Sequence, residues 1–266
     1  MLTDCAAKAK ANRLFATVAV LAVATVLAGC ANNRLTTGSI ARGGAAPAAS
    51  ADMSAGQLAS ATERLGQSYT RSPTDRDTAL RYAEALQMTG RTEQALAVMR
   101  KAAIDHPTER SVLAAYGKAL ASAGELQPAL DAVRRAQTPE YPDWKLVSAE
   151  AAILDQLGQT QEARALYRRA LELKPDEPSV LSNLGMSYLL EGDLPQAETN
   201  MRRAVGQPGA DSRVRQNLAL VVGLQGRFDE AEQIAANELS PDQAQANVEY
   251  LRSMLSQQNA WQQLRD

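Results

Sequence analysis

Few side chains in this sequence have a type and spacing that could carry out covalent, acid–base or metal chemistry. The one histidine, His106, lies in an Asp-His-Pro segment without a nucleophile or a second ligand beside it, whereas catalytic and metal sites need several such groups together. Gly117-Lys118 looks like the end of a phosphate loop, but the upstream glycine and the Ser or Thr are missing. We therefore expect no catalytic residue, no metal ligand, no cofactor and no small-molecule substrate.

Both cysteines, Cys5 and Cys30, lie within the first thirty residues, so no disulfide or thiolate metal site is expected beyond them. A basic start and an apolar run over residues 14–27 precede Cys30. Basic residues, a short apolar stretch and small residues before a cleavage point are typical of a secretory signal. The run is shorter than the ~20 residues that span a bilayer.

The segment Leu27-Ala28-Gly29-Cys30 resembles the bacterial lipoprotein box, in which the cysteine is lipidated and becomes the first residue. The resemblance implies a signal peptide at 1–29 and a lipidated Cys30. Ala31, rather than Asp, follows, which resembles the outer-membrane sorting pattern and implies a protein lipid-anchored on the periplasmic face. The alternative is an uncleaved membrane anchor with an incidental cysteine. Residues 30–53 are rich in Ala, Gly, Ser and Thr, which predicts a flexible linker.

The rest of the composition favours a chain built from helices. Hydrophobic residues make up 45 % of the chain but aromatic residues only 4 %, and a core of Ala and Leu suits closely packed helices. Without residues 1–29 there remain 25 basic and 29 acidic residues, a formal net charge of −4. No basic stripe with interleaved aromatic residues is present, so we expect no nucleic-acid partner.

Self-similarity with a period of 34 residues is the strongest signal. Glycines recur at this spacing at Gly90, Gly124, Gly158, Gly192 and Gly226. Seven residues before each glycine stands a small residue, at Ala83, Gly117, Ala151, Gly185 and Ala219. Five residues after each glycine stands an alanine, at Ala95, Ala129, Ala163, Ala197 and Ala231. The glycine would end a first helix in the left-handed conformation, and the small residues would let a second helix cross it closely.

This pattern closely resembles the tetratricopeptide repeat. We expect an all-α tetratricopeptide-repeat superhelix, an α-solenoid of antiparallel helical hairpins. Five repeats are expected over 76–245, beginning at residues 76, 110, 144, 178 and 212. Residues 54–75 read as an N-terminal partial repeat and residues 246–266 as a C-terminal capping helix.

The expected function lies in a surface, because the repeat fold places fixed positions of each first helix along a groove. In the fourth and fifth repeats these positions become apolar, which is typical of partner sites. The proposed partner groove consists of Asn183, Met186, Leu189, Leu190, Arg213, Asn217, Leu220 and Leu224. The leucines and Met186 would anchor a partner, the asparagines would fix its register, and Arg213 would take a carboxylate.

Two alternatives stay open for this groove. The last helix of the chain could cover it with its own apolar side chains, which are Tyr250, Leu251, Leu255 and Trp261. Asn183 and Asn217 could also join adjacent repeats to each other instead of binding a partner.

Residues 178–198, 213–232 and 246–264 resemble the TadD family, the tetratricopeptide-repeat lipoproteins of the Tad/Flp (tight adherence) pilus assembly system. The resemblance implies an outer-membrane lipoprotein that faces the periplasm and helps to assemble the secretin channel, in a pilotin-like role. The alternative is an adaptor of another envelope machine, such as outer-membrane barrel assembly or cell-wall hydrolase regulation. The residues themselves indicate a membrane-anchored scaffold that binds proteins and is not an enzyme.

Overall fold

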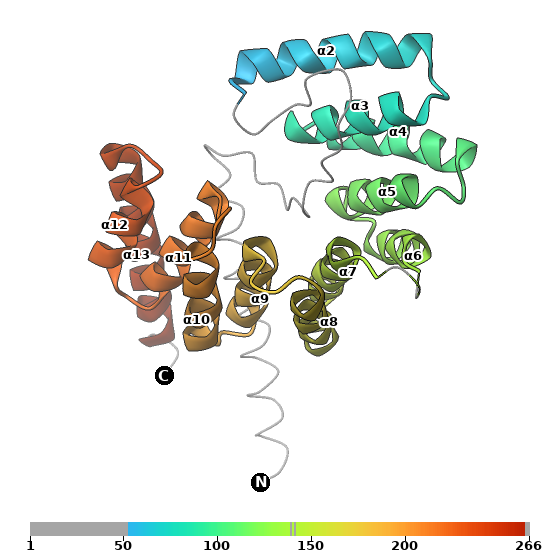
Figure 1. Cartoon of the computed structure of the whole chain (residues 1–266). Coiled ribbons are helices and arrows are strands. Elements are labelled where there is room, and N and C mark those ends of the chain that lie inside the picture. The colour runs from blue at the N-terminus through green and yellow to red at the C-terminus, as the bar shows by residue number, and fades with distance from the viewer. Residues whose placement is uncertain (1–52, 139, 141, 264–266) are drawn as a thin grey trace. The chain divides into compact units, whose positions relative to one another are not determined.

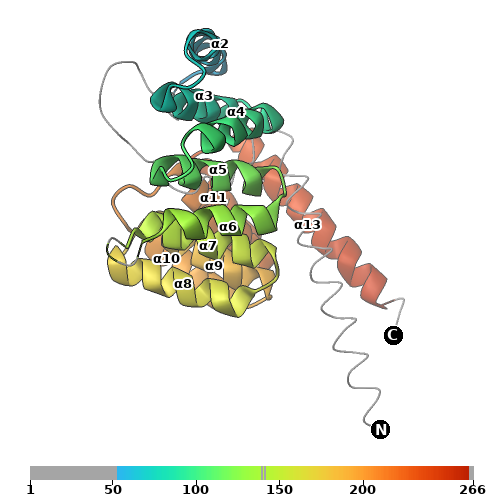
Figure 2. The same ribbon diagram turned by 90° about the vertical axis from the view of Figure 1, so that its right-hand side faces the viewer.

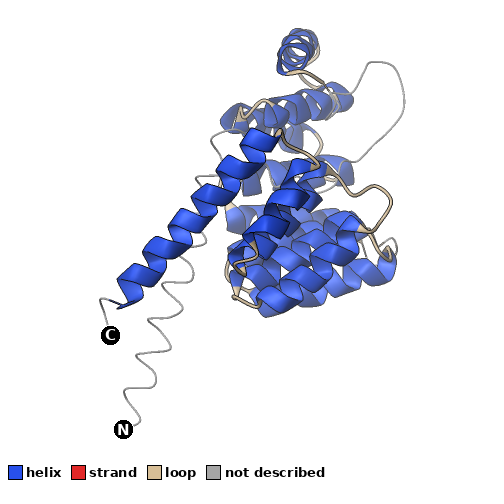
Figure 3. Ribbon diagram, turned by 90° about the vertical axis from the view of Figure 1, so that its left-hand side faces the viewer, coloured by secondary structure: helices blue, strands red, loops and turns tan. Residues whose placement is uncertain are grey.

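The computed structural model describes residues 53–138, 140 and 142–263, with the side chains of residues before 258. The expected signal peptide, the lipidation site Cys30 and nearly all of the expected linker lie outside the described residues. Within that part of the chain the backbone forms twelve α-helices and no strand (Figure 1 and Figure 3). None of these helices is long and apolar enough to cross a membrane.

The helices form two compact units, which divide in the sequence between Leu173 and Lys174. The N-terminal unit contains α2 Ala55–Arg71, α3 Arg76–Met88, α4 Thr92–Asp105, α5 Arg110–Ser122, α6 Leu126–Ala136, α7 Trp144–Gln156 and α8 Thr160–Leu173. The C-terminal unit contains α9 Pro178–Leu190, α10 Leu194–Val205, α11 Ser212–Leu224, α12 Phe228–Ala236 and α13 Pro241–Gln263.

In the N-terminal unit, α2 packs on α3, and three hairpins follow one another: α3 with α4, α5 with α6, and α7 with α8 (Figure 1). Each hairpin also packs on the next, because one hairpin cannot bury its own apolar face. The contact inside the second hairpin is close. A Cβ on Gly117 of α5 would lie 2.6 Å from the Val133 Cγ2 and 3.1 Å from the Ala129 carbonyl oxygen on α6. The small residue and the alanine therefore meet at the helix crossing, as their spacing predicts.

The turn inside every hairpin is made by one of the periodic glycines. All five have φ between 77° and 82°, in the left-handed region that side chains disfavour. The next residue then donates its N–H to a carbonyl five residues earlier, as Glu125 does to Leu120 at 2.9 Å. This is the Schellman arrangement that ends a helix and satisfies its last carbonyl groups. The predicted role of the glycines is confirmed.

In the C-terminal unit, α9 pairs with α10, α11 pairs with α12, and α13 packs on α11 and α12. α12 has nine residues and is the shortest helix among the described residues. The alanine that would continue its packing face is replaced by Glu238, whose carboxylate pairs with Arg215. The polar side chain at this position helps to explain why α12 ends early.

α13 has 23 residues and begins at Pro241, five residues before the start expected from the repeat period. The local sequence explains this difference. The Ser240 Oγ accepts a hydrogen bond from the Gln243 N–H at 3.4 Å, and the Gln243 side chain accepts one from the Ser240 N–H at 3.3 Å. This capping box, followed by proline at the first helical position, starts the helix at Pro241. In Figure 2 and Figure 3 α13 is one straight helix whose C-terminal end projects away from α11 and α12.

Candidate partner-binding groove

The residues expected to bind a partner lie on α9 and α11, the first helices of the fourth and fifth repeats, and these two helices pack against each other. One side of α9 is fixed against α10. A Cβ on Gly185 would lie 2.8 Å from the Met201 Cγ and 3.0 Å from the Ala197 carbonyl oxygen. An α-helix has about 3.6 residues per turn, so residues two positions before and five positions after Gly185 point to other sides of α9. Positions 183 and 190 are therefore not turned toward α10.

The apolar part of the groove is formed by four half-buried side chains. Met186 and Leu190 come from α9, and Leu220 and Leu224 come from α11. Met186, Leu220 and Leu224 pack against the buried cluster that contains Leu218. The apolar surface is therefore continuous with the core of the unit, and a partner's apolar group would meet a floor that is already formed.

Leu189 departs from its expected place. Its side chain is 4 % exposed and belongs to the buried cluster, together with Val221 and Val222 of α11. This repeat position faces the next hairpin of the stack rather than the open side of α9. Leu189 therefore stabilises the contact between the two repeats and offers no surface to a partner.

The polar part of the groove combines both roles that the sequence left open for its asparagines. The Asn217 Nδ2 donates a hydrogen bond to the Ser182 Oγ at 3.1 Å and so joins α11 to α9. Asn183 is half-buried, and its side chain makes no hydrogen bond to the described residues. Arg213 forms an ion pair with Asp211 at 3.1 Å. A carboxylate of a partner would therefore have to compete with the carboxylate of Asp211 for this guanidinium. Asn183 is thus the polar side chain best able to bind a partner.

α13 packs on α11 and α12 and leaves the apolar groove side chains partly accessible. Leu251 fills the space beside α11, where its Cδ2 lies 2.5 Å from the position that a Cβ on Gly223 would take. Val248 of α13 joins the buried cluster, and Ala244 packs against Ala219. With α13 in place the four apolar groove residues are still half-buried. Tyr250 points outward and is 38 % exposed, whereas the side chain of Trp261 lies outside the described residues.

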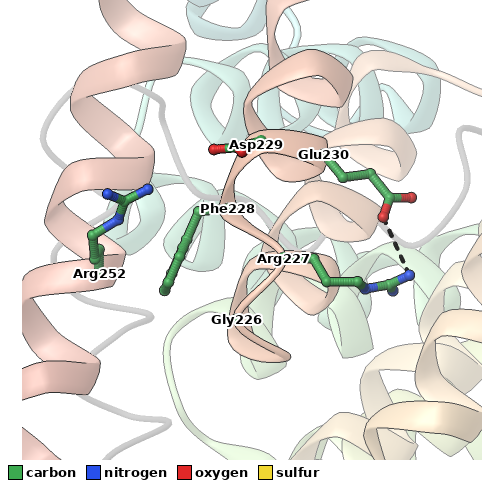
Figure 4. A pocket seen from close by; sticks show the side chains of 6 residues that line it. All are labelled: Gly226, Arg227, Phe228, Asp229, Glu230 and Arg252. Atoms are coloured by element: carbon green, nitrogen blue, oxygen red, sulfur yellow. Dashed lines mark ion pairs between the residues drawn. The ribbon is translucent and has the colours of Figure 1, made fainter.

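His106 is the one histidine of the sequence and the first candidate for acid–base or metal chemistry. No group of three or more His, Cys, Asp or Glu side chains in the part of the chain that the structure describes could hold a metal ion. The His106 Nε2 lies 2.9 Å from the carbonyl oxygen of Thr74, in a turn between helices. A surface depression beside the start of α12 contains the Arg252 guanidinium, 4.7 Å from the centre of the Phe228 ring (Figure 4). This contact ties α13 to α12, since a guanidinium is attracted to an aromatic face.

Comparison with known families agrees with the repeat geometry. A family described as "Tetratricopeptide repeat" matches residues 52–119, and one described as "TPR repeat" matches residues 153–192. The chain is a tetratricopeptide-repeat (TPR) protein. The expected all-α class and its antiparallel TPR hairpins are confirmed. No curated protein matches the sequence.

Solved structures share this TPR fold at low sequence identity. A chain of the APC/C hetero-tetramer Cut9–Hcn1 aligns with a TM-score of 0.60 and 16 % identity over 77 % of this protein, which spans 40 % of that longer chain. TTC0263, a TPR protein of the thermophile Thermus thermophilus, aligns with a TM-score of 0.58 and 22 % identity, over 68 % of this protein and 99 % of that one. PilW, a widely conserved type IV pilus biogenesis factor, aligns with a TM-score of 0.57 and 20 % identity, over 75 % and 91 %. These likenesses establish the fold.

Proposed function

We propose that this TPR protein is a lipid-anchored scaffold on the periplasmic face of the outer membrane that assists assembly of a Tad/Flp pilus secretin, in a pilotin-like role. One observation carries the binding part of the proposal. The side chains of Asn183, Met186, Leu190, Asn217, Leu220 and Leu224, which form the predicted groove, keep part of their surface accessible after the chain has packed its own last helix. The similarity to PilW and the resemblance of the sequence to the TadD lipoproteins support the pilus part.

The groove suits an amphipathic helix from the partner. Met186, Leu190, Leu220 and Leu224 provide apolar contacts, which supply most of the binding free energy in helix-in-groove recognition. Asn183 carries amide groups that can hydrogen-bond the backbone at one end of such a helix. These groove side chains are all uncharged, and the neighbouring Arg213 is already paired with Asp211. The partner segment therefore needs apolar side chains more than opposite charge.

A double substitution tests this function. Leu190→Asp with Leu220→Asp places two carboxylates on the apolar floor while leaving the buried Leu189 in place. A matched control, Gln196→Asp with Gln233→Asp, adds the same charge at exposed positions of α10 and α12. Each protein would replace the wild type in a strain that carries a Tad/Flp system, and secretin multimers would be followed by immunoblotting.

We expect the groove variant to remain helical by circular dichroism and to lose at least about tenfold in secretin capture, the equivalent of 1.4 kcal/mol. The control should behave as the wild type. Normal secretin assembly with the groove variant would refute the role of the groove. Capture of a barrel-assembly or hydrolase component in place of the secretin would refute the pilus assignment and favour the other envelope function.

A further inference from the structure

The carboxylate of Glu198 on α10 binds three donors from two consecutive repeats. Its Oε1 accepts a hydrogen bond from the Arg202 Nε at 2.7 Å. Its Oε2 accepts one from the Gln225 Nε2 at 2.7 Å and lies 2.5 Å from the Arg227 Nη2. Gln225 and Arg227 stand on either side of Gly226, in the turn between α11 and α12. A single carboxylate therefore holds both sides of this turn against α10.

Two further contacts close these interactions into a ring of alternating charge. The guanidinium of Arg202 also pairs with Glu230 of α12, and the Arg227 Nη1 lies 3.2 Å from the Glu230 Oε2 (Figure 4). The ring contains two acidic and two basic side chains and connects α10, the turn and α12. The hydrogen bond from Arg227 is the largest cause that lowers the pKa of Glu198 from 4.5 to about 2. Glu198 is therefore ionised at neutral pH, and its side chain is only 15 % exposed.

A carboxylate at this place is not explained by packing. The equivalent position of the first two repeats holds Leu96 and Leu130, which are 2 % and 3 % exposed in the core of the N-terminal unit. The third and fifth repeats hold Arg164, which is buried, and Glu232 at this position. Glu198 therefore lacks the apolar burial that stabilises Leu96 and Leu130. The turn after α5 shows a simpler arrangement, in which Glu125 beside Gly124 forms an exposed ion pair with Arg100 at 3.1 Å.

The turn that Glu198 holds is continuous with one wall of the groove. Gln225 directly follows Leu224, the last residue of α11, and its side chain also donates to the Val221 carbonyl oxygen at 3.4 Å. Fixing Gln225 on α10 fixes the end of α11 that carries Leu220 and Leu224. The opposite wall is on α9, which is itself fixed on α10 through Gly185. The separation of the two walls therefore depends on how α9 and the end of α11 are each held on α10.

We propose that Glu198 is a positioning residue that sets the width of the partner groove by holding the Gln225–Arg227 turn against α10. That a partner binds in this groove rests on the proposed function. The width of the groove, however, can be measured without any partner. A spin label on each wall reports this width directly. The labels would be placed at Leu190→Cys and Leu224→Cys in the full chain with Cys5→Ser and Cys30→Ser, and their separation would be measured by double electron–electron resonance.

Glu198→Leu removes the ring and introduces the residue found at the same position of the first two repeats. We expect the distance distribution to become about twofold wider, because the end of α11 is then free to move, while the melting temperature changes little. Glu232→Leu is the matched control, since Glu232 lies 34 residues further, is half-buried and forms no ion pair with the described residues. Its distribution should remain as narrow as that of the parent.

Arg227→Gln is a second test that does not alter the core, because Arg227 is 41 % exposed. It should widen the distribution as Glu198→Leu does. A narrow distribution in both ring variants, or equal widening in the Glu232 control, would overturn the proposal. If the wild-type groove is narrow but no secretin is captured, the proposed function fails while the positioning role of Glu198 stands.

Discussion

The side-chain amide of Asn217 on α11 donates a hydrogen bond to the Ser182 hydroxyl on α9, across the boundary between two repeats. Asn183 occupies the same repeat position as Asn217, one repeat earlier, yet it makes no such bond to the described residues. Two identical side chains in equivalent places therefore differ in their hydrogen bonding, since Asn217 joins α11 to α9 and Asn183 joins no described residue. The first stabilises the stack, and the second stays available to a partner.

This difference predicts different effects of two alanine substitutions. Asn217→Ala should lower the free energy of unfolding by about 1–2 kcal/mol, because Ser182 is buried and would lose its partner. Asn183→Ala should change it by less than about 0.5 kcal/mol but weaken secretin capture. Urea unfolding followed by circular dichroism measures the first quantity. Equal destabilisation by the two substitutions would contradict the assigned roles.

The repeat register predicts where a large side chain cannot fit. Ala163 on α8 is fully buried, whereas Gln159 is exposed in the turn before that helix. Ala163→Trp should overpack the crossing of α7 and α8 and cost about 1–3 kcal/mol. Gln159→Trp should change the stability by less than about 0.5 kcal/mol. Thermal melts that coincide for the two variants would show that the register is wrong.

The ring around Glu198 predicts a stabilisation that disappears in acid. The pKa of Glu198 is lowered in the folded chain, from 4.5 to about 2, so its contribution is complete above pH 4.5 and is lost as the pH falls toward 2. The difference in unfolding free energy between the wild type and Glu198→Gln should therefore shrink by about 1–2 kcal/mol between pH 6 and pH 3. Urea midpoints at the two pH values give this difference. A constant difference would mean that the carboxylate is not stabilised by the ring.

The proposed lipid anchor at Cys30 predicts the effect of removing this cysteine. One acyl chain gives only marginal membrane binding, so the several chains of a bacterial lipoprotein anchor should hold the protein lastingly. Cys30→Ser should leave the chain either uncleaved or released into the periplasm. Fractionation and mass spectrometry of the N-terminus distinguish these products from the wild type. A mature Cys30→Ser protein that still sediments with the outer membrane would contradict the lipid anchor.

The hairpins could be predicted from the sequence because each periodic residue has one structural role. A glycine with φ near +80° and an alanine at a helix crossing tolerate few substitutes, so both keep their places in every repeat. The repeat period alone predicts the wrong start for α13, because the capping residues Ser240 and Gln243 start this helix before the period ends. The repeat pattern predicts an outward-facing side chain at the position of Leu189 in every repeat. In this chain the next hairpin covers it.

The ring of Glu198, Arg202, Arg227 and Glu230 could not be derived in the same way. Its members come from three segments, and ionic side chains at helical spacing are common on exposed surfaces. One signal was present in the sequence. Glu198 stands where the first two repeats have Leu96 and Leu130, and a charged residue at a core position requires partners nearby.

The contact between Leu251 and Gly223 determines where the stack of hairpins stops. Each hairpin of the C-terminal unit offers its successor an apolar face, and an uncovered last face would accept the first hairpin of another molecule as readily as a helix of its own chain. Leu251 fills the hollow above Gly223, and the outward side of α13 carries polar residues such as Gln243, Glu249 and Ser253. The chain's own last helix therefore occupies the face through which copies of the molecule would otherwise stack end to end.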